Sequence, residues 1–105
     1  AQFGLKPDLN ASLAWYEKLA NDKSKPNWVD GARNAGYLYG LLYKQTHDAQ
    51  YLKKAEKLLE EGYKNGDTAS GRVLVQVLSA SDKKEDQEKS ENIKKSLELQ
   101  EGALK

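Results

Sequence analysis

Hydrophobic residues recur along most of this chain at the spacing of amphipathic helices. The clearest stretch is 48–65, in which one helical face is apolar or small and the other is charged. The first face comprises Tyr51, Leu52, Ala55, Leu58, Leu59, Gly62 and Tyr63. On the charged face, Lys57 and Glu61 have opposite charges four residues apart, which stabilises a helix. We therefore predict a helix over 48–65.

Four further stretches have the same spacing, and we predict helices over 8–21, 27–45, 68–80 and 84–103. Polar, turn-forming residues separate consecutive stretches. In the turn at 65–67, Gly66 suits a left-handed helix end and Asp67 suits the first cap of the next helix. Because the connections are short, consecutive helices should run antiparallel as helical hairpins.

The stretch 72–78 also has the pattern of a strand, because valines alternate at positions 73, 75 and 77. The same residues place Ala69, Val73 and Val77 on one face of a helix. An internal repeat favours the helix. The segment 35–43 aligns with 69–77 at an offset of 34 residues, and 59–62 aligns with 99–102 at an offset of 40. Repeats of this length are typical of stacked helical hairpins.

The repeat predicts the organisation of the whole chain. We expect an all-α fold of about five helices, in which antiparallel helical hairpins stack as a short α-solenoid. Residues 1–105 would form a single helical-repeat domain. Its parts would be a half repeat at about 8–21, a repeat at about 27–65 and a degenerate repeat at about 67–104.

Glycines occur inside the predicted helices, where each costs on the order of 1 kcal/mol relative to alanine. Helices that cross closely leave no room for a side chain at the contact. We therefore predict that Gly40 and Gly62 lie at helix crossings. Gly36 and Gly40 also have the spacing of membrane-helix dimers, but the apolar run 35–43 is too short to span a bilayer.

The sequence YGLLY at 39–43, followed by DAQYLKKAEKLLEEGYKNGDTA at 48–69, resembles the Sel-one-like branch of the tetratricopeptide repeat superfamily. The matching residues are Ala35, Tyr39, Gly40, Tyr43, Asp48, Lys54, Ala55, Leu58, Leu59, Gly62, Gly66 and Ala69. The stretch 12–21 resembles the second helix of a preceding repeat. The resemblance implies stacked hairpins whose first helices line a concave surface, and an adaptor role that is more often bacterial.

The composition narrows the classes of partner and compartment. The chain has 17 Lys and Arg against 16 Asp and Glu, and its net charge of +1 gives no reason to expect nucleic acid or an anionic membrane. It has no cysteine, which excludes disulfides and thiol chemistry but fits any compartment. It has no methionine, so we expect a processed product or an excised fragment. A signal-peptidase cut before Ala1 would favour a periplasmic or secreted protein, and a cytoplasmic location stays open.

Residues that could support catalysis do not form a recognisable set. His47 lies between two predicted helices, where we expect an exposed loop or cap residue rather than a base or ligand. The acidic run 82–92 is typical of solvated helix surface, because paired catalytic carboxylates need unlike environments. No glycine-rich phosphate loop or nucleophile motif occurs. We predict no catalytic residue, no metal site and no cofactor, and therefore no enzyme.

Tyrosines are the remaining candidates for function. Tyr39 and Tyr43 should lie in the core, whereas Tyr37 falls on the adjacent face. If the first helices line one surface, residues of two of these helices face the same partner. We predict partner-binding residues at Asn34, Tyr37, Leu41, Lys44, Arg72, Val75 and Gln76. Tyrosine and arginine are common interface anchors, although a tyrosine at the edge of the core is the alternative interpretation of Tyr37.

These observations favour a non-catalytic protein–protein interaction module that binds a protein or peptide on its concave face. The alternative is a dedicated inhibitor, immunity or regulatory protein that blocks a single partner. A small hydrolase or transferase is a third hypothesis, for which no candidate site was found. The pattern predicts neither nucleic-acid binding nor membrane insertion, and it leaves the oligomeric state open.

Overall fold

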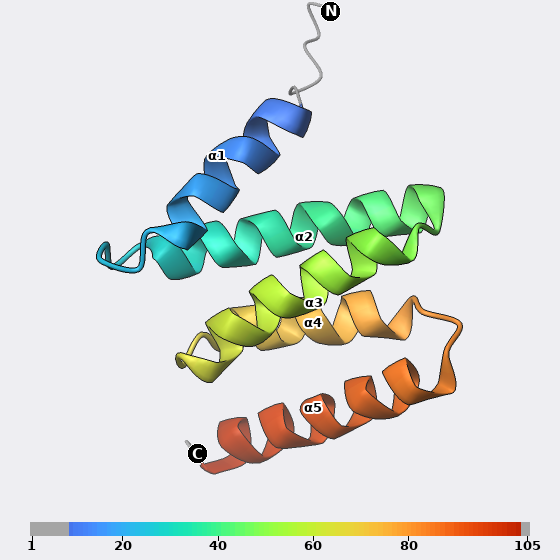
Figure 1. The fold of residues 1–105 in the computed structure, drawn as a ribbon. Helices are drawn as coiled ribbons and strands as arrows, with labels where there is room; N and C mark the ends of the chain where they lie inside the picture. The colour runs from blue at the N-terminus through green and yellow to red at the C-terminus, as the bar shows by residue number, and fades with distance from the viewer. Residues whose placement is uncertain (1–8, 104–105) are drawn as a thin grey trace, which may run out of the picture.

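A computed structural model describes residues 9–103, and every regular element in this range is an α-helix (Figure 1). The helices are α1 (Leu9–Asn21), α2 (Trp28–Thr46), α3 (Ala49–Lys64), α4 (Thr68–Ser79) and α5 (Lys84–Ala103). Within the described range, each helix begins and ends within one residue of its predicted bounds. The predicted helix start at Asp8 and the last residues of the predicted domain, Leu104 and Lys105, lie outside that range. An all-α fold is confirmed for residues 9–103.

The stretch 72–78 lies inside α4, which excludes the strand alternative. Leu74 and Leu78 are completely buried, and they are four residues apart. The helical period therefore governs how this segment packs, although its alternating valines would also suit a strand.

The turn between α3 and α4 has the predicted cap residues. Gly66 has a positive φ of 95°, which glycine adopts without strain. The Asp67 side chain accepts a hydrogen bond from the backbone N–H of Ser70 and so caps α4. His47 caps the end of α2 with a φ of 57°, and its backbone N–H donates to the Tyr43 carbonyl at 2.7 Å. Its side chain is exposed, as expected for a cap residue.

The five helices lie in sequence order from one end of the molecule to the other (Figure 1). Each helix packs against the next, and α2 also contacts α4. In Figure 1, α2 and α4 run in nearly the same direction, and α1 and α3 are tilted alike. The core lies between these helices. Its buried residues are Leu13, Ala35, Tyr39, Tyr43, Leu52, Ala55, Leu59, Leu74, Val77 and Leu78.

Tyr39 and Tyr43 belong to this core, as predicted. The Tyr39 ring stacks on that of Tyr51, with 6.0 Å between ring centres. Burial and a hydrogen bond with the Glu17 carboxylate raise the pKa of Tyr39 to about 12. The phenol is therefore neutral at physiological pH and adds no charge to the core.

Close helix crossings explain the glycines. A Cβ atom at Gly40 would lie 2.6 Å from Cγ2 of Val77 in α4, and one at Gly62 would collide with the Ser70 side chain. Both predicted crossings are therefore confirmed. Gly36 has the same role against Leu59 of α3, whose Cγ would be 2.5 Å from an added Cβ. The helix cost of these glycines is offset by closer packing.

The burial pattern corrects the offset between α2 and α4. At the predicted offset of 34 residues, exposed Tyr37 aligns with buried Gly71. At an offset of 35, six of the nine pairs have the same degree of burial, and the other three, Gly40 with Val75, Leu41 with Gln76 and Leu42 with Val77, differ by one class. The aligned pairs include Ala35 with Ser70, Gly36 with Gly71, Tyr37 with Arg72, Leu38 with Val73, Tyr39 with Leu74 and Tyr43 with Leu78. Contacts between helices therefore fix an offset one residue longer than the sequence comparison predicts.

The alignment of α3 with α5 is also corrected. Leu99, which the sequence comparison matches with buried Leu59, is 75% exposed. No atom lies within 4 Å of a Cβ added at Gly102, so this glycine does not repeat the close contact of Gly62. Leu97 is buried, and its Cδ2 lies 3.3 Å from a Cβ added at Gly71, where the Tyr63 ring of α3 is closer, at 2.7 Å; Leu97 is thus the α5 leucine that lies against Gly71, as Leu59 of α3 lies against Gly36. The structural offset between these helices is therefore 38 residues, from Leu59 to Leu97.

Candidate interaction surface

The residues predicted to bind a partner lie on α2 and α4, at varying depths. Tyr37 is 46% exposed, a larger fraction than for any other aromatic residue of α2. Lys44, Arg72 and Gln76 are also exposed. Asn34, Leu41 and Val75 are half-buried. We call the exposed side of α2 and α4 that carries Tyr37, Leu41, Arg72 and Gln76 the α2–α4 face.

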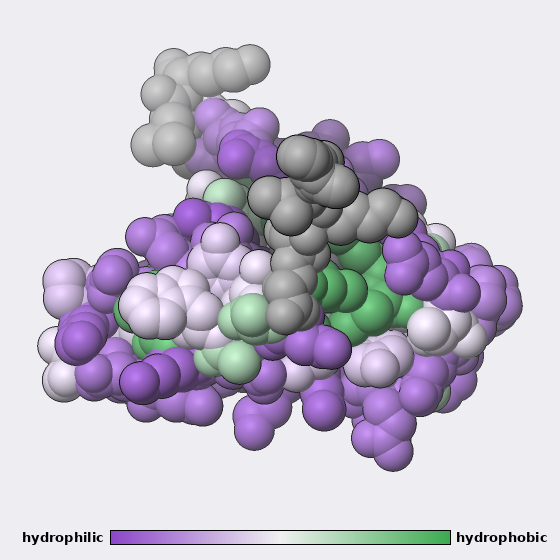
Figure 2. Space-filling model, turned by 90° about the horizontal axis from the view of Figure 1, so that it is seen from above, coloured by the Kyte–Doolittle hydropathy of each residue, from purple (hydrophilic) through white to green (hydrophobic). Residues whose placement is uncertain are grey.

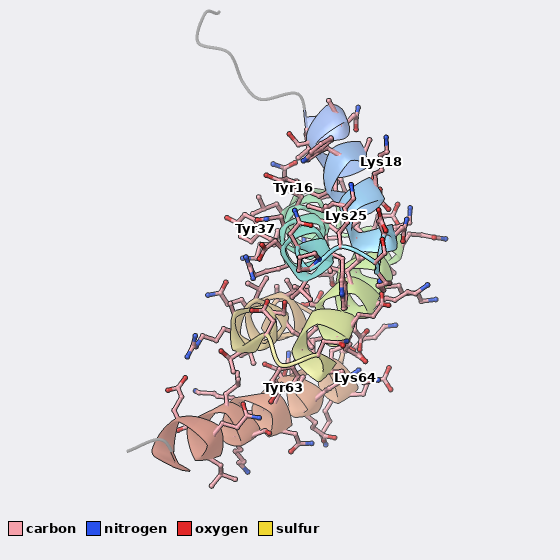
Figure 3. The ribbon with its side chains drawn as sticks, turned by 90° about the vertical axis from the view of Figure 1, so that its left-hand side faces the viewer. Tyr16, Lys18, Lys25, Tyr37, Tyr63 and Lys64 are labelled. Carbon is pink, nitrogen blue, oxygen red and sulfur yellow. The ribbon has the colours of Figure 1, made fainter. Side chains whose placement is uncertain are left out.

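On α2, the predicted residues share one side of the helix. The Asn34 side-chain amide donates a hydrogen bond to the Asp30 backbone carbonyl at 2.9 Å, so one of its donors already has a partner within α2. Figure 3 shows Tyr37 pointing to the same side of the molecule as Tyr16 of α1, which is half-buried. Tyr16 is not among the residues predicted to bind a partner. The tilt of α1 against α2, which a helical period does not reveal, brings it to this side.

On α4, the corrected offset separates Val75 from the other residues. Arg72 aligns with Tyr37, and Gln76 aligns with Leu41, so these four occupy matching positions on the two helices. Val75 aligns instead with Gly40, and its carbonyl accepts a hydrogen bond from the Ser90 hydroxyl of α5 at 3.1 Å. The backbone of Val75 is therefore linked to α5, and its position does not match any of the four residues of the α2–α4 face.

Arg72 is already engaged at the edge of this face. Its guanidinium donates to the Glu101 carboxylate of α5 at 2.5 Å, and both side chains are about half exposed. An ion pair this exposed contributes little to stability. Arg72 can therefore exchange Glu101 for an acidic group of a partner at small cost.

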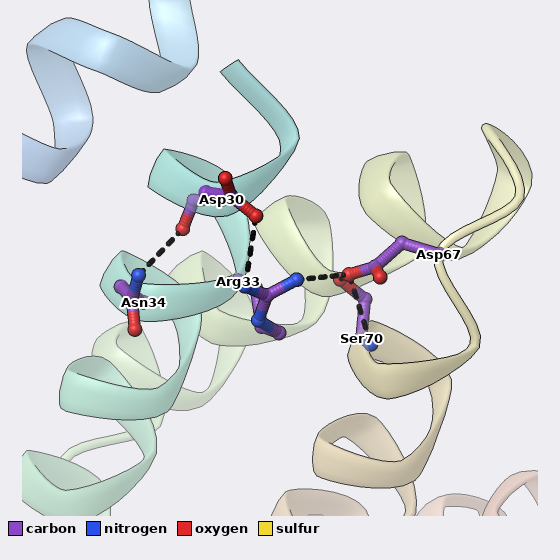
Figure 4. A network of polar contacts seen from close by, with 5 residues as sticks. All are labelled: Asp30, Arg33, Asn34, Asp67 and Ser70. Carbon is purple, nitrogen blue, oxygen red and sulfur yellow. Dashed lines mark hydrogen bonds and ion pairs between the residues drawn. The ribbon is translucent and has the colours of Figure 1, made fainter. Parts of the chain in front are cut away.

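A network of partly buried polar side chains holds α2 and the start of α4 in register (Figure 4). Arg33 donates one hydrogen bond to Asp30 and another to Asp67, each at 2.8 Å. Asp67 also accepts hydrogen bonds from the backbone N–H and the hydroxyl of Ser70. Sequence reasoning predicted the cap but not the ion pair. The pairing of Arg33 with Asp67 depends on the contact between two helices that are far apart in the sequence.

The network changes the titration of Asp67. Burial alone would raise the pKa of this carboxyl, but the hydrogen bonds from Ser70 and Arg33 outweigh burial and hold the pKa below its usual value. A carboxyl with a depressed pKa stabilises the fold above its unfolded-state pKa of about 3.9. That stabilisation is lost as the pH falls through the lower, folded-state pKa.

We expect Asp67→Asn to lower the free energy of unfolding by about 1 kcal/mol at pH 7. Asparagine caps a helix about as well as aspartate, so the loss reports the charge that pairs with Arg33. Urea titrations at several pH values provide the measurement. The difference between wild type and variant should be constant above about pH 5 and shrink toward pH 3. A difference that stays unchanged at low pH would show that the carboxylate charge is not responsible.

Groups that could hold a metal are not found among residues 9–103, where no cluster of three or more His, Cys, Asp or Glu side chains has suitable geometry. Within the same range, no helix has the length and apolar character needed to cross a membrane. Comparison with protein-family models, curated proteins and solved structures gives no match for this chain. The Sel-one-like resemblance therefore rests on the residues quoted above.

Proposed function

We propose that this chain is a non-catalytic helical-repeat module that binds a protein or peptide on the α2–α4 face. The observation that carries the proposal is the exposure of Tyr37 on a helix whose other tyrosines, Tyr39 and Tyr43, are buried. A large aromatic side chain on a rigid helix loses little conformational entropy on binding, which is why tyrosine is frequent at binding hot spots.

The arrangement of helices supports a repeat architecture. Gly36 of α2 and Gly71 of α4 occupy matching positions, and each leaves room for side chains of neighbouring helices: Leu59 of α3 at Gly36, and Tyr63 of α3 with Leu97 of α5 at Gly71. We propose on this basis that the hairpins form a short α-solenoid of the Sel-one-like kind, with a half repeat at 8–21 and repeats at 27–65 and 67–104. Such an arrangement presents matching positions of successive first helices on one side.

The α2–α4 face has the chemistry of a protein-binding surface. Tyr37 and Leu41 supply apolar contact, while Lys44, Arg72 and Gln76 supply hydrogen-bond donors around them. The network of Arg33 and Asp67 holds the two helices in place before a partner arrives. A preorganised surface of this kind loses less entropy on binding than a flexible one.

We expect Tyr37→Ala and Arg72→Ala each to weaken partner binding by about 1–3 kcal/mol while leaving the fold intact. The wild-type chain and a double variant with both substitutions are immobilised and used as paired baits to capture a partner. A genuine partner is retained by the first and lost from the second. Titration of the purified partner against each single variant then gives the change in Kd.

Lys57→Glu is the matched control. It reverses a charge at an exposed position of α3, outside the α2–α4 face. It should alter only the association rate. Loss of binding in Lys57→Glu together with full binding in Tyr37→Ala would contradict the proposed surface. A single partner bound at subnanomolar Kd would favour a dedicated inhibitor over an adaptor.

A further inference from the structure

The helices of the α2–α4 face carry more positive than negative charge, although the chain as a whole is nearly neutral. They contain the cations Arg33, Lys44 and Arg72 but a single carboxylate, that of Asp30. Asp30 is paired with Arg33 at 2.8 Å, and Arg33 is also paired with Asp67. The charges that the face can offer to a partner are therefore Lys44 and Arg72, which are both exposed.

The ion pair of Arg72 shows which chemical group the face can hold. The guanidinium donates a hydrogen bond to a carboxylate oxygen of Glu101 at 2.5 Å, and among residues 9–103 no other carboxylate pairs with Arg72 or Lys44. This bond uses one nitrogen, Nη2, whereas a guanidinium can bind a carboxylate through two parallel hydrogen bonds. Because the Arg72 side chain is 55% exposed, a carboxylate can approach it from solvent.

The carboxylate that occupies Arg72 comes from outside the two helices of the face. Glu101 lies in the last turn of α5, and its side chain is 51% exposed. Two half-exposed side chains gain little free energy from pairing, because water and salt screen their charges. The face thus already holds a carboxylate at Arg72, but it holds this carboxylate weakly.

Apolar surface accompanies these charges on α2. Tyr37 is 46% exposed, and Leu41 and Lys44 follow it at intervals of four and three residues, so the three share one side of the helix. In the view of Figure 2, hydrophobic surface of the molecule likewise lies between hydrophilic margins. A segment that fits the α2–α4 face must therefore combine carboxylates with apolar side chains.

We propose that the partner of the α2–α4 face is an acidic peptide segment, in which one carboxylate displaces Glu101 from Arg72 and apolar side chains cover Tyr37 and Leu41. Glu101 is then an internal competitor. A neutral segment that covers Arg72 breaks the ion pair without replacing it, whereas an acidic segment restores it, so Glu101 also favours acidic partners over neutral ones. The inference rests on the proposed function, because it names the kind of partner that the same face binds.

The first experiment determines which peptides the face selects. A phage-displayed library of random short peptides is selected on the immobilised wild-type chain, and peptides that also bind the Tyr37→Ala variant are discarded. This variant removes no charge, so the discarding step does not itself select acidic peptides. The remaining peptides should be enriched in Asp and Glu beside apolar residues. Remaining peptides without acidic enrichment would overturn the inference and leave the proposed function standing, whereas a library with no remaining peptides would overturn both.

The second experiment locates the carboxylate that binds Arg72. The most enriched peptide is synthesised with a fluorescent label, and each of its Asp or Glu residues is replaced in turn by Asn or Gln. In anisotropy titrations, one replacement should weaken binding to the wild-type chain about tenfold. The same replacement should have little effect on binding to Arg72→Gln, because the two groups act as a pair. A tenfold loss that persists in Arg72→Gln would overturn the proposed contact.

Two variants of α5 test the competition by Glu101. Glu101→Gln removes the internal carboxylate and should tighten binding of the acidic peptide about threefold. Glu91→Gln makes the same change of charge at another exposed position of α5 and should leave the Kd unchanged at physiological salt, where distant charges are screened. Circular dichroism verifies that both variants fold. Equal tightening in the two variants, or none in Glu101→Gln, would overturn the displacement of Glu101.

Discussion

Replacing Gly40 by leucine should lower the free energy of unfolding by about 3 kcal/mol. Even a single added Cβ would lie 2.6 Å from Cγ2 of Val77, which is closer than carbon atoms approach without strain. Val77 cannot give way easily, because it is buried and its β-branched side chain is stiff. The helices α2 and α4 must therefore separate, and buried contacts around them are lost. Urea or thermal denaturation gives the change.

Gly102→Leu is the matched control for this prediction. Gly102 is also a helical glycine, but no atom lies within 4 Å of its added Cβ. Leucine is the better helix former, so this variant should be as stable as wild type or more stable by up to about 1 kcal/mol. If Gly40→Leu raises the melting temperature as Gly102→Leu does, α2 and α4 do not cross closely at Gly40.

Leu59→Ala should destabilise the protein by about 2–5 kcal/mol, the largest effect expected for a single substitution here. Leu59 is completely buried, and its Cγ lies 2.5 Å from the position that a Cβ of residue 36 would have. Truncation removes apolar contacts and leaves a cavity between α2 and α3. Equilibrium unfolding in urea measures the loss.

A double-mutant cycle with Gly36→Ala tests the same contact more sharply. Alone, Gly36→Ala should be destabilising, because its Cβ collides with Leu59. In the background of Leu59→Ala, the new methyl group enters the cavity and should restore part of the lost stability. We expect a coupling of about 1–3 kcal/mol, whereas additive effects would mean that residues 36 and 59 are not in contact.

Helix positions and core tyrosines could be predicted from the sequence because local rules determine them. The amphipathic period and the Gly66–Asp67 turn fix where α3 ends and where α4 begins. Tyr39 and Tyr43 are four residues apart on the apolar face of α2, so a single helix suffices to place them in the core. Gly40 could be interpreted as a crossing because glycine is otherwise unfavourable in a helix.

The offset between α2 and α4 could not be predicted, because the apolar run of α4 fits two alignments with α2. Its run of Val73, Leu74, Val75 and Val77 presents an apolar residue at either offset. Only packing against α3 and α5 decides which residues are buried, and α5 also binds the backbone carbonyl of Val75 through the Ser90 hydroxyl. The ion pair of Arg33 with Asp67 was missed for the same reason, since it forms between helices.

Hydrogen–deuterium exchange of the chain, alone and bound to the partner captured with the paired baits, tests the central claim most directly. If the α2–α4 face binds the partner, exchange slows in segments 34–44 and 72–76. Exchange in segment 53–64 of α3, where the exposed control residue Lys57 lies, stays unchanged. Protection confined to 53–64, with 34–44 and 72–76 unaffected, would contradict the account.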